Sequence, residues 1–419
     1  MEGGKPGWND AMNGLPGLLG SGMPETYEML RILRYCRTAL ESYNRPVEFP
    51  VEFATFFAQV TSALDIYSNS PQAPQDDVAY WDATATARES YRAAVVAYFE
   101  GNRQALPASY VISAIEKMES KVEKGISKAL ATGTGLSPTY FYYDCTDFSL
   151  STVGSELHLK PNSFVQRTLP LFLEGPTRHL KVISDIEERR RVHQLVKSSP
   201  LYDVGLKMYT ICESLASMGQ DVGRMKAFSP GWLENQSVWL HMSYKYYLEL
   251  LRGGLYEEFF EEISTGLVPF MNNDIYGRSP LEAASFIVSS AFPDSKLHGA
   301  SFLARLSGST AEFLSMWQFM MTGPSPFVKN EFGEVQLQLR PVLPGNIFDQ
   351  NNSVSFTFLG QIEVSYQNPK RIDTWKTVPQ SILVVKNDGS TVTIPGSVIG
   401  TEIALQVRSL QVVKIVVVF

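Results

Sequence analysis

A loop near the start of the chain contains the residue types of a general acid and a sugar-stacking surface. In "KPGWNDAMNGLPGLLGSG", Asp10 stands two residues after Trp8, among glycines and prolines that disfavour a helix. A carboxyl group in a crowded, partly dry loop has a raised pKa, which suits a proton donor. The indole of Trp8 is a common type of surface for sugar stacking. Alternatively, Asp10 caps a short helix that begins at Ala11, and the residues leave both interpretations open.

A second candidate segment is "PGWLENQSVWLHMSYKYY". Glu234 and His241 are seven residues apart, which is two turns of a helix, so we expect both on one face. With Trp232 just before them, they would form a polar wall for a ligand. In the alternative interpretation, Glu234 stabilises the helix N-terminus and His241 is a hydrogen-bonded core histidine.

A third candidate segment, "LHGASFLARLSGSTAEFLSMW", is typical of an anion site. Ser307, Gly308 and Ser309 come directly before an amphipathic helical pattern, where backbone N–H groups and the helix dipole favour negative charge. Glycine lets an anion approach the backbone closely, and His298 and Arg305 add positive charge nearby. Alternatively, these hydroxyl residues only cap a helix. No Walker signature, G-x-S-x-G elbow or metal-ligand cluster accompanies them.

The elements that must position these residues are mainly helical. Apolar residues recur at three and four positions from about 24 to 131 and again from about 174 to 322, including "VWLHMSYKYYLELLRGG", "PLEAASFIVSSAF" and "TAEFLSMWQFMM". Between them, 138–172 is aromatic and β-branched, which predicts a β-rich excursion. Helical hairpins in succession favour an (α/α)6 toroid, although a plain helical array gives the same pattern.

The remainder of the chain changes to short β-branched runs. "SILVVKNDGSTVTIPGS" has an Asp-Gly turn between two of them, which predicts a β-hairpin. We therefore expect a mainly α part and then an all-β part: a catalytic (α/α)6-barrel part over 1–325 and a β-sandwich-like C-terminal domain over 326–419.

Composition excludes several classes of protein. The net charge of −7 and pI near 5.4 argue against a nucleic-acid binder. Cys36, Cys145 and Cys212 are too scattered for a zinc site and suggest core thiols in a reducing compartment. No secretory signal pattern or membrane-length apolar stretch is visible in the sequence. We expect a soluble cytoplasmic protein without a membrane or nucleic-acid partner.

The three segments, in this order, resemble the inverting β-glucoside phosphorylases, the group around cellobiose and chitobiose phosphorylase. The longer relatives that act on β-1,3-glucan (laminarin) or β-1,2-glucan oligosaccharides look most similar. "GWNDAMN" is similar to the family's G-D-W-N-D-G-M-N loop, "ENQSVWLH" to its E-N-G-G-x-x-x-H helix, and "RLSGST" to its Thr-Gly-Ser/Thr phosphate segment. The chain departs from the pattern at Gly7, where the family often has Asp, and at Ala300, where shorter relatives have Arg.

The resemblance implies inverting phosphorolysis of β-glucan oligosaccharides, with Asp10 as the general acid and inorganic phosphate as co-substrate. No metal or organic cofactor is implied, and relatives are often homodimers. We expect phosphate to be bound by His241, Ser307, Gly308 and Ser309, and the sugar by Trp8, Trp232, Glu234 and Glu25.

Two alternatives stay open. An inverting (α/α)6 hydrolase would need a second catalytic carboxylate, for which Glu234 is the obvious candidate. In the resembling family a β-sandwich, a linker and the first barrel helices precede the W-N-D loop. The chain is therefore expected to be a C-terminal fragment with an incomplete toroid, and a non-catalytic carbohydrate-binding fragment is the second alternative.

Overall fold

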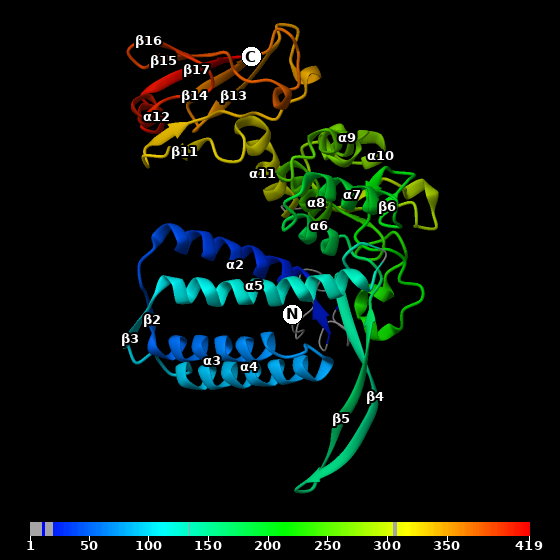
Figure 1. Cartoon of the computed structure of the whole chain (residues 1–419). Coiled ribbons are helices and arrows are strands. Elements are labelled where there is room, and N and C mark those ends of the chain that lie inside the picture. The colour runs from blue at the N-terminus through cyan, green and yellow to red at the C-terminus, as the bar shows by residue number, and fades with distance from the viewer. Residues whose placement is uncertain (1–10, 13–19, 134, 305–307) are drawn as a thin grey trace. The chain divides into compact units, whose positions relative to one another are not determined.

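The protein combines α-helices with several β-sheets in two compact units (Figure 1). The computed structural model describes residues 11–12, 20–133, 135–304 and 308–419. The first unit spans Met1–Leu169 and the second Pro170–Phe419, and each is described by itself. This division differs from the boundary near 325 that the sequence suggests, and the domain assignment stays a prediction. Among the described residues, no helix has the length and apolar character needed to cross a membrane.

The first unit is mainly helical, as the apolar spacing predicts. α2 packs against α5, and α3 packs against α4. A cluster of apolar side chains from α3 and α5, including Phe57, Val111 and Ile115, forms part of its core with Leu33 and Leu40 of α2. The elements of this unit up to residue 131 are β1 (Ser21–Gly22), α2 (Pro24–Tyr43), β2 (Val47–Pro50), α3 (Val51–Ser68), α4 (Pro74–Val95), β3 (Arg103–Leu106) and α5 (Ala108–Ala131).

The β-rich excursion predicted for 138–172 is a long antiparallel hairpin. β4 (Tyr140–Val153) pairs with β5 (Glu156–Thr168) from Phe141 opposite Thr168 to Val153 opposite Glu156. Gly154 has a φ of +66° in the connecting turn, where glycine avoids the steric cost of a side chain. The short β1 pairs with the start of β4.

The second unit begins with helices and short strands. Its elements up to residue 322 are α6 (Glu174–Leu180), α7 (Ile186–Lys197), β6 (Tyr202–Asp203), β7 (Met208–Tyr209), the 3-10 turns Gln220–Val222 and Arg224–Ala227, β8 (Val238–Trp239), α8 (Leu240–Arg252), α9 (Tyr256–Gly266), the 3-10 turn Val268–Phe270, α10 (Asn273–Tyr276), β9 (Ala284–Ile287), the 3-10 turn Ser295–Leu297, β10 (Ser301–Ala304) and α11 (Gly308–Thr322). The helices expected around α8, α9 and α11 are confirmed.

The helix expected in "PLEAASFIVSSAF" is wrong, because this segment contains β9. β9 is the middle strand of a three-stranded antiparallel sheet between β8 and β10, and all four of its residues are buried. A short, fully buried strand is as continuously apolar as a buried helix segment, so apolar spacing does not separate the two.

The C-terminal region is β-rich, in agreement with the change of sequence texture. Its main sheet has the strand order β13-β14-β17-β15-β16, with β14 and β17 parallel and the other pairs antiparallel. It also contains one helix that an all-β region would lack. The elements are β11 (Phe327–Lys329), β12 (Val335–Leu337), the 3-10 turn Gly345–Ile347, β13 (Ser353–Phe358), β14 (Ile362–Gln367), the 3-10 turn Thr374–Lys376, β15 (Ser381–Lys386), β16 (Thr391–Pro395), α12 (Thr401–Arg408) and β17 (Val412–Val418).

The hairpin predicted from the Asp-Gly turn is confirmed. β15 and β16 pair from Ser381 opposite Pro395 to Val385 opposite Thr391, and Gly389 has a φ of +83° in the turn. In β15, Ile382 and Val384 are buried while their neighbours are more exposed, which is the alternation expected of a sheet with one covered face.

A buried polar network fixes helix α8 between two neighbours. His193 of α7 is hydrogen-bonded through Nδ1 to the Tyr246 hydroxyl of α8 at 2.8 Å. Its Nε2 lies 3.5 Å from Glu262 Oε1 of α9, which also pairs with Lys197 Nζ at 2.8 Å. Burial lowers the pKa of His193 to about 4, with a further contribution from the Lys197 charge, and burial raises the pKa of Glu262. Because buried polar groups need partners, this network favours one placement of α8.

Close packing of α9 on α8 gives a test of this arrangement. A Cβ added at Gly266 would lie 2.2 Å from the Tyr247 hydroxyl oxygen, so we expect Gly266→Ala to lower the free energy of unfolding by about 1–3 kcal/mol. Gly125→Ala is the control, because Gly125 lies inside α5 with no heavy atom near its Cβ position. It should raise stability by about 0.5–1 kcal/mol. Urea denaturation measures the free energy of unfolding of both variants. A Gly266→Ala variant as stable as the wild type would contradict the close packing of α9 on α8.

Candidate functional site: an imidazole against a helix N-terminus

Helix α8 presents His241 and Lys245 on one face. The chain enters α8 from β8 with Trp239 in an extended conformation, and the helix ends before Gly253 and Gly254, the latter with a φ of +81°. Residues four apart in a helix are neighbours on its surface. His241 and Lys245 are both partly exposed, with side-chain exposures of 24% and 22%.

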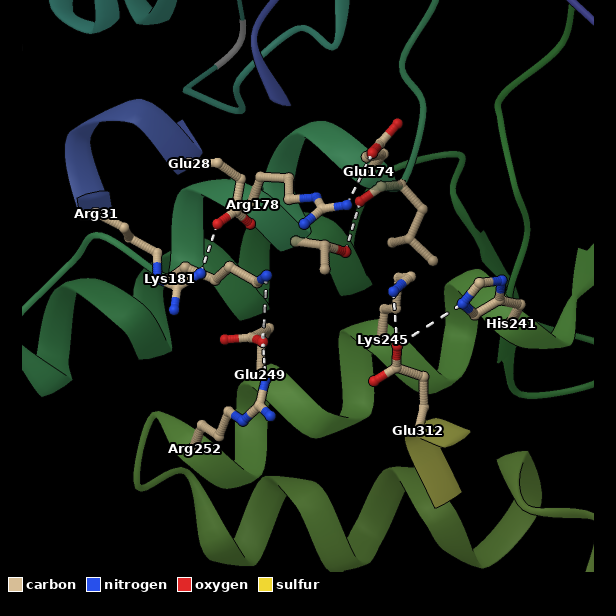
Figure 2. A network of polar contacts seen from close by, with 12 residues as sticks. Glu28, Arg31, Glu174, Arg178, Lys181, His241, Lys245, Glu249, Arg252 and Glu312 are labelled. Atoms are coloured by element: carbon tan, nitrogen blue, oxygen red, sulfur yellow. Dashed lines mark hydrogen bonds and ion pairs between the residues drawn. The ribbon is translucent and has the colours of Figure 1, made fainter. Parts of the chain in front are cut away.

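Helix α11 packs against α8 and contributes the carboxylate of Glu312. Glu312 Oε1 lies 2.6 Å from Lys245 Nζ and 3.7 Å from His241 Nε2, so one oxygen is shared by two basic groups (Figure 2). Burial acts to raise the pKa of Glu312, but hydrogen bonds and charges from His241 and Lys245 outweigh it and lower the pKa to about 2. Glu312 is therefore ionised at neutral pH.

The first residue of α11, Gly308, lies directly against the His241 imidazole. A Cβ added at Gly308 would be 2.0 Å from Cε1, 2.1 Å from Nε2 and 2.3 Å from Nδ1 of that ring. These three nearly equal distances place that Cβ position over the face of the ring, on its Cε1 side, so the ring face lies against the backbone at the helix start. Two segments 67 residues apart in the chain (308 − 241) thus meet at this point.

This arrangement has the chemistry of an anion site. The start of α11 provides backbone N–H groups and the positive end of the helix dipole, and a protonated imidazole would add a positive charge beside them. Ser309, the second residue of α11, is fully buried. The structure thus brings together His241, Gly308 and Ser309 of the predicted phosphate residues, while Ser307 lies outside the described residues.

The segment around Glu234 differs from its expected helical form. Leu233 and Gln236 have φ values of +50° and +55°, and Trp232 forms a bridge with Asn235, so residues 232–236 make an irregular turn. α8 starts only at Leu240, so the expectation that Glu234 and His241 share a helix face is wrong. Left-handed backbone at non-glycine residues is uncommon, and the apolar spacing gives no signal of it.

Trp232 belongs to an aromatic cluster. Its ring centroid lies 4.6 Å from that of Phe302, 5.1 Å from Phe286 and 5.5 Å from Phe292. The indole thus packs on β9, β10 and the loop between them, and remains partly exposed. Nearby, His298 makes a hydrogen bond through Nε2 to the Phe292 carbonyl at 2.8 Å.

The remaining candidates belong to the first unit or lie outside the described part of the chain. Glu25 is exposed in the first turn of α2, and its Oε2 would lie 2.8 Å from a Cβ at Gly22. Trp8, Asp10 and Arg305 are outside the described residues. Within residues 11–12, 20–133, 135–304 and 308–419, no group of three His, Cys, Asp or Glu side chains is arranged to hold a metal ion.

Sequence reasoning missed Lys245 and Glu312. Lys245 follows His241 by four residues in a segment predicted to be helical, so a search for basic residues on the His241 face would have found it. Glu312 follows Gly308 by four residues, but no local pattern indicates that α11 packs on α8 in this register.

A scan against protein-family models and a search of curated proteins found no match to this chain.

Gly308→Ala tests the contact between α11 and His241. The new methyl group would overlap the imidazole and displace it, so we expect the affinity for inorganic phosphate to fall about tenfold or more. Gly400→Ala, at the start of α12 with nothing near its Cβ position, is the matched control and should bind phosphate like the wild type. Isothermal titration with phosphate measures both, and equal affinities would contradict the site.

The lowered pKa of Glu312 predicts a pH dependence of stability. Because the folded value lies near 2 and the ordinary value is 4.5, Glu312 stabilises the folded state above pH 4.5 and loses this contribution as the pH falls toward 2. The loss is on the order of 3 kcal/mol. Urea denaturation between about pH 7 and about pH 3 should show a shallower acid decline for Glu312→Gln than for the wild type. Parallel declines would contradict the ion pairing.

Proposed function

We propose that the protein catalyses inverting phosphorolysis of β-glucosidic bonds in β-glucan oligosaccharides. The products are α-glucose 1-phosphate and a shortened glucan, and the reaction is reversible. The observation that carries this proposal is the contact of His241 with Gly308 at the start of α11, since two segments selected from the sequence as phosphate-binding meet there. The similarity of three segments to the β-glucoside phosphorylases supports the same activity.

In the proposed mechanism, Asp10 protonates the glycosidic oxygen as the bond between this oxygen and the anomeric carbon breaks. A phosphate oxygen attacks the anomeric carbon from the opposite face, so the configuration inverts. An inverting hydrolase needs a second carboxylate to activate water, whereas phosphate is already an anionic nucleophile. Its main requirement is an aligned position, which His241, Ser307, Gly308 and Ser309 would supply. Trp8, Trp232, Glu234 and Glu25 would bind the sugar.

The proposal extends to architecture. The helices of 1–325 would belong to an (α/α)6 toroid, and 326–419 would form a β-sandwich-like domain. The C-terminal region has a five-stranded sheet and the two-stranded sheet of β11 and β12, and the larger sheet is compatible with one layer of such a sandwich.

The proposed activity is tested by measuring glucose 1-phosphate released from β-1,3-, β-1,2- and β-1,4-linked oligosaccharides with and without phosphate. We expect release only with phosphate, and we expect Asp10→Asn to abolish it because the leaving oxygen is no longer protonated. The same variant should bind phosphate like the wild type. Glu234→Gln should weaken sugar binding more than turnover.

Two other results would contradict phosphorolysis. Phosphate-independent release of sugar that is abolished in Glu234→Gln would identify a hydrolase. Sugar binding with no bond cleavage in any condition would identify a binding protein. Loss of both turnover and phosphate binding in Asp10→Asn would instead show that the loop around Asp10 is structural.

A further inference from the structure

The carboxylate of Glu312 connects the two basic side chains of α8. Both Lys245 Nζ, at 2.6 Å, and His241 Nε2, at 3.7 Å, approach the same atom, Glu312 Oε1 (Figure 2). The Glu312 side chain is 16% exposed, so water screens these charges less than it would on an open surface. Lys245 faces His241 from α8 and Glu312 faces it from α11.

An acceptor at one imidazole nitrogen determines which nitrogen carries the proton of a neutral ring. It also fixes the orientation of the ring. Here the carboxylate of Glu312 is on the Nε2 side of the ring, and the ring face lies against Gly308. Rotation of the imidazole would therefore change both the contact with Glu312 and the contact with the start of α11.

An unneutralised carboxylate beside a phosphate site would repel the ligand. The charges of Glu312 and Lys245 cancel (−1 + 1 = 0), because their closest atoms are only 2.6 Å apart. A protonated His241 then leaves one net positive charge in the group of three. Lys245 thus lets the carboxylate remain near an anion.

We propose that Glu312 is a positioning residue that orients His241 for phosphate, with Lys245 neutralising its carboxylate. This inference rests on the proposed function in one respect, namely that His241 contacts phosphate.

The test uses the full chain and inorganic phosphate without sugar. The single variants are Glu312→Gln, Glu312→Asp and Lys245→Met, and the double variant combines Lys245→Met with Glu312→Gln. The matched control is Glu258→Gln. It removes a carboxylate from another interhelical pair, Arg190–Glu258 at 2.6 Å, in which the glutamate side chain is similarly shielded at 18% exposure. The readouts are phosphate affinity by titration calorimetry and the ¹⁵N spectrum of the histidine side chains, assigned with His241→Gln.

In the wild type we expect the ¹⁵N spectrum to show a proton on Nε2 of His241. Glu312→Gln should change this signature and reduce phosphate affinity about tenfold. Glu312→Asp should give an intermediate affinity, because the carboxylate is kept but shortened. Glu258→Gln should leave the phosphate affinity and the His241 signals unchanged.

The double variant separates electrostatics from general damage. Lys245→Met leaves Glu312 unneutralised, so it should weaken phosphate binding, and adding Glu312→Gln should restore part of the affinity. Losses that simply add, or an unchanged His241 spectrum in Glu312→Gln, would overturn the positioning role. If the spectrum and phosphate affinity change as expected but no glucose 1-phosphate is formed by the wild type, phosphorolysis fails while the role of Glu312 stands.

Discussion

The close approach of Gly308 to the His241 imidazole is the constraint on which the candidate site depends. The ring occupies the space in which any other residue at position 308 would place its Cβ. The start of α11 and the basic face of α8 can therefore meet only with glycine at this position. The same packing places Glu312 near His241 and Lys245, so one contact between helices brings together the candidate anion-binding groups and the carboxylate beside them.

Contacts on a different face of α8, made with α7 and α9, fix the position of this helix. Tyr246, next to Lys245 in sequence, is hydrogen-bonded to His193 of α7, whose other ring nitrogen approaches Glu262 of α9. Tyr247 packs against Gly266 at the end of α9. Buried aromatic and polar contacts thus hold the helix, while its partly exposed side chains are directed to α11. Stability and the candidate chemistry use different faces of one helix.

Sequence patterns predicted the secondary-structure elements better than the tertiary contacts between them. The helical character of α2 was predictable from its apolar spacing, the β-rich character of 140–168 from its aromatic and β-branched residues, and the hairpin of 381–395 from its Asp-Gly turn. β9 was mistaken for a helix because a short buried strand has no distinctive spacing. Glu234 was misplaced because left-handed backbone at Leu233 and Gln236 leaves no periodic signal.

The meeting of His241 with Gly308 is tested most directly by a crystal structure of the chain grown with inorganic phosphate. We expect a phosphate at the first turn of α11, within hydrogen-bond distance of the Gly308 backbone nitrogen and of one His241 ring nitrogen, with Glu312 still paired to Lys245. A phosphate bound elsewhere, or an imidazole turned away from Gly308, would contradict it.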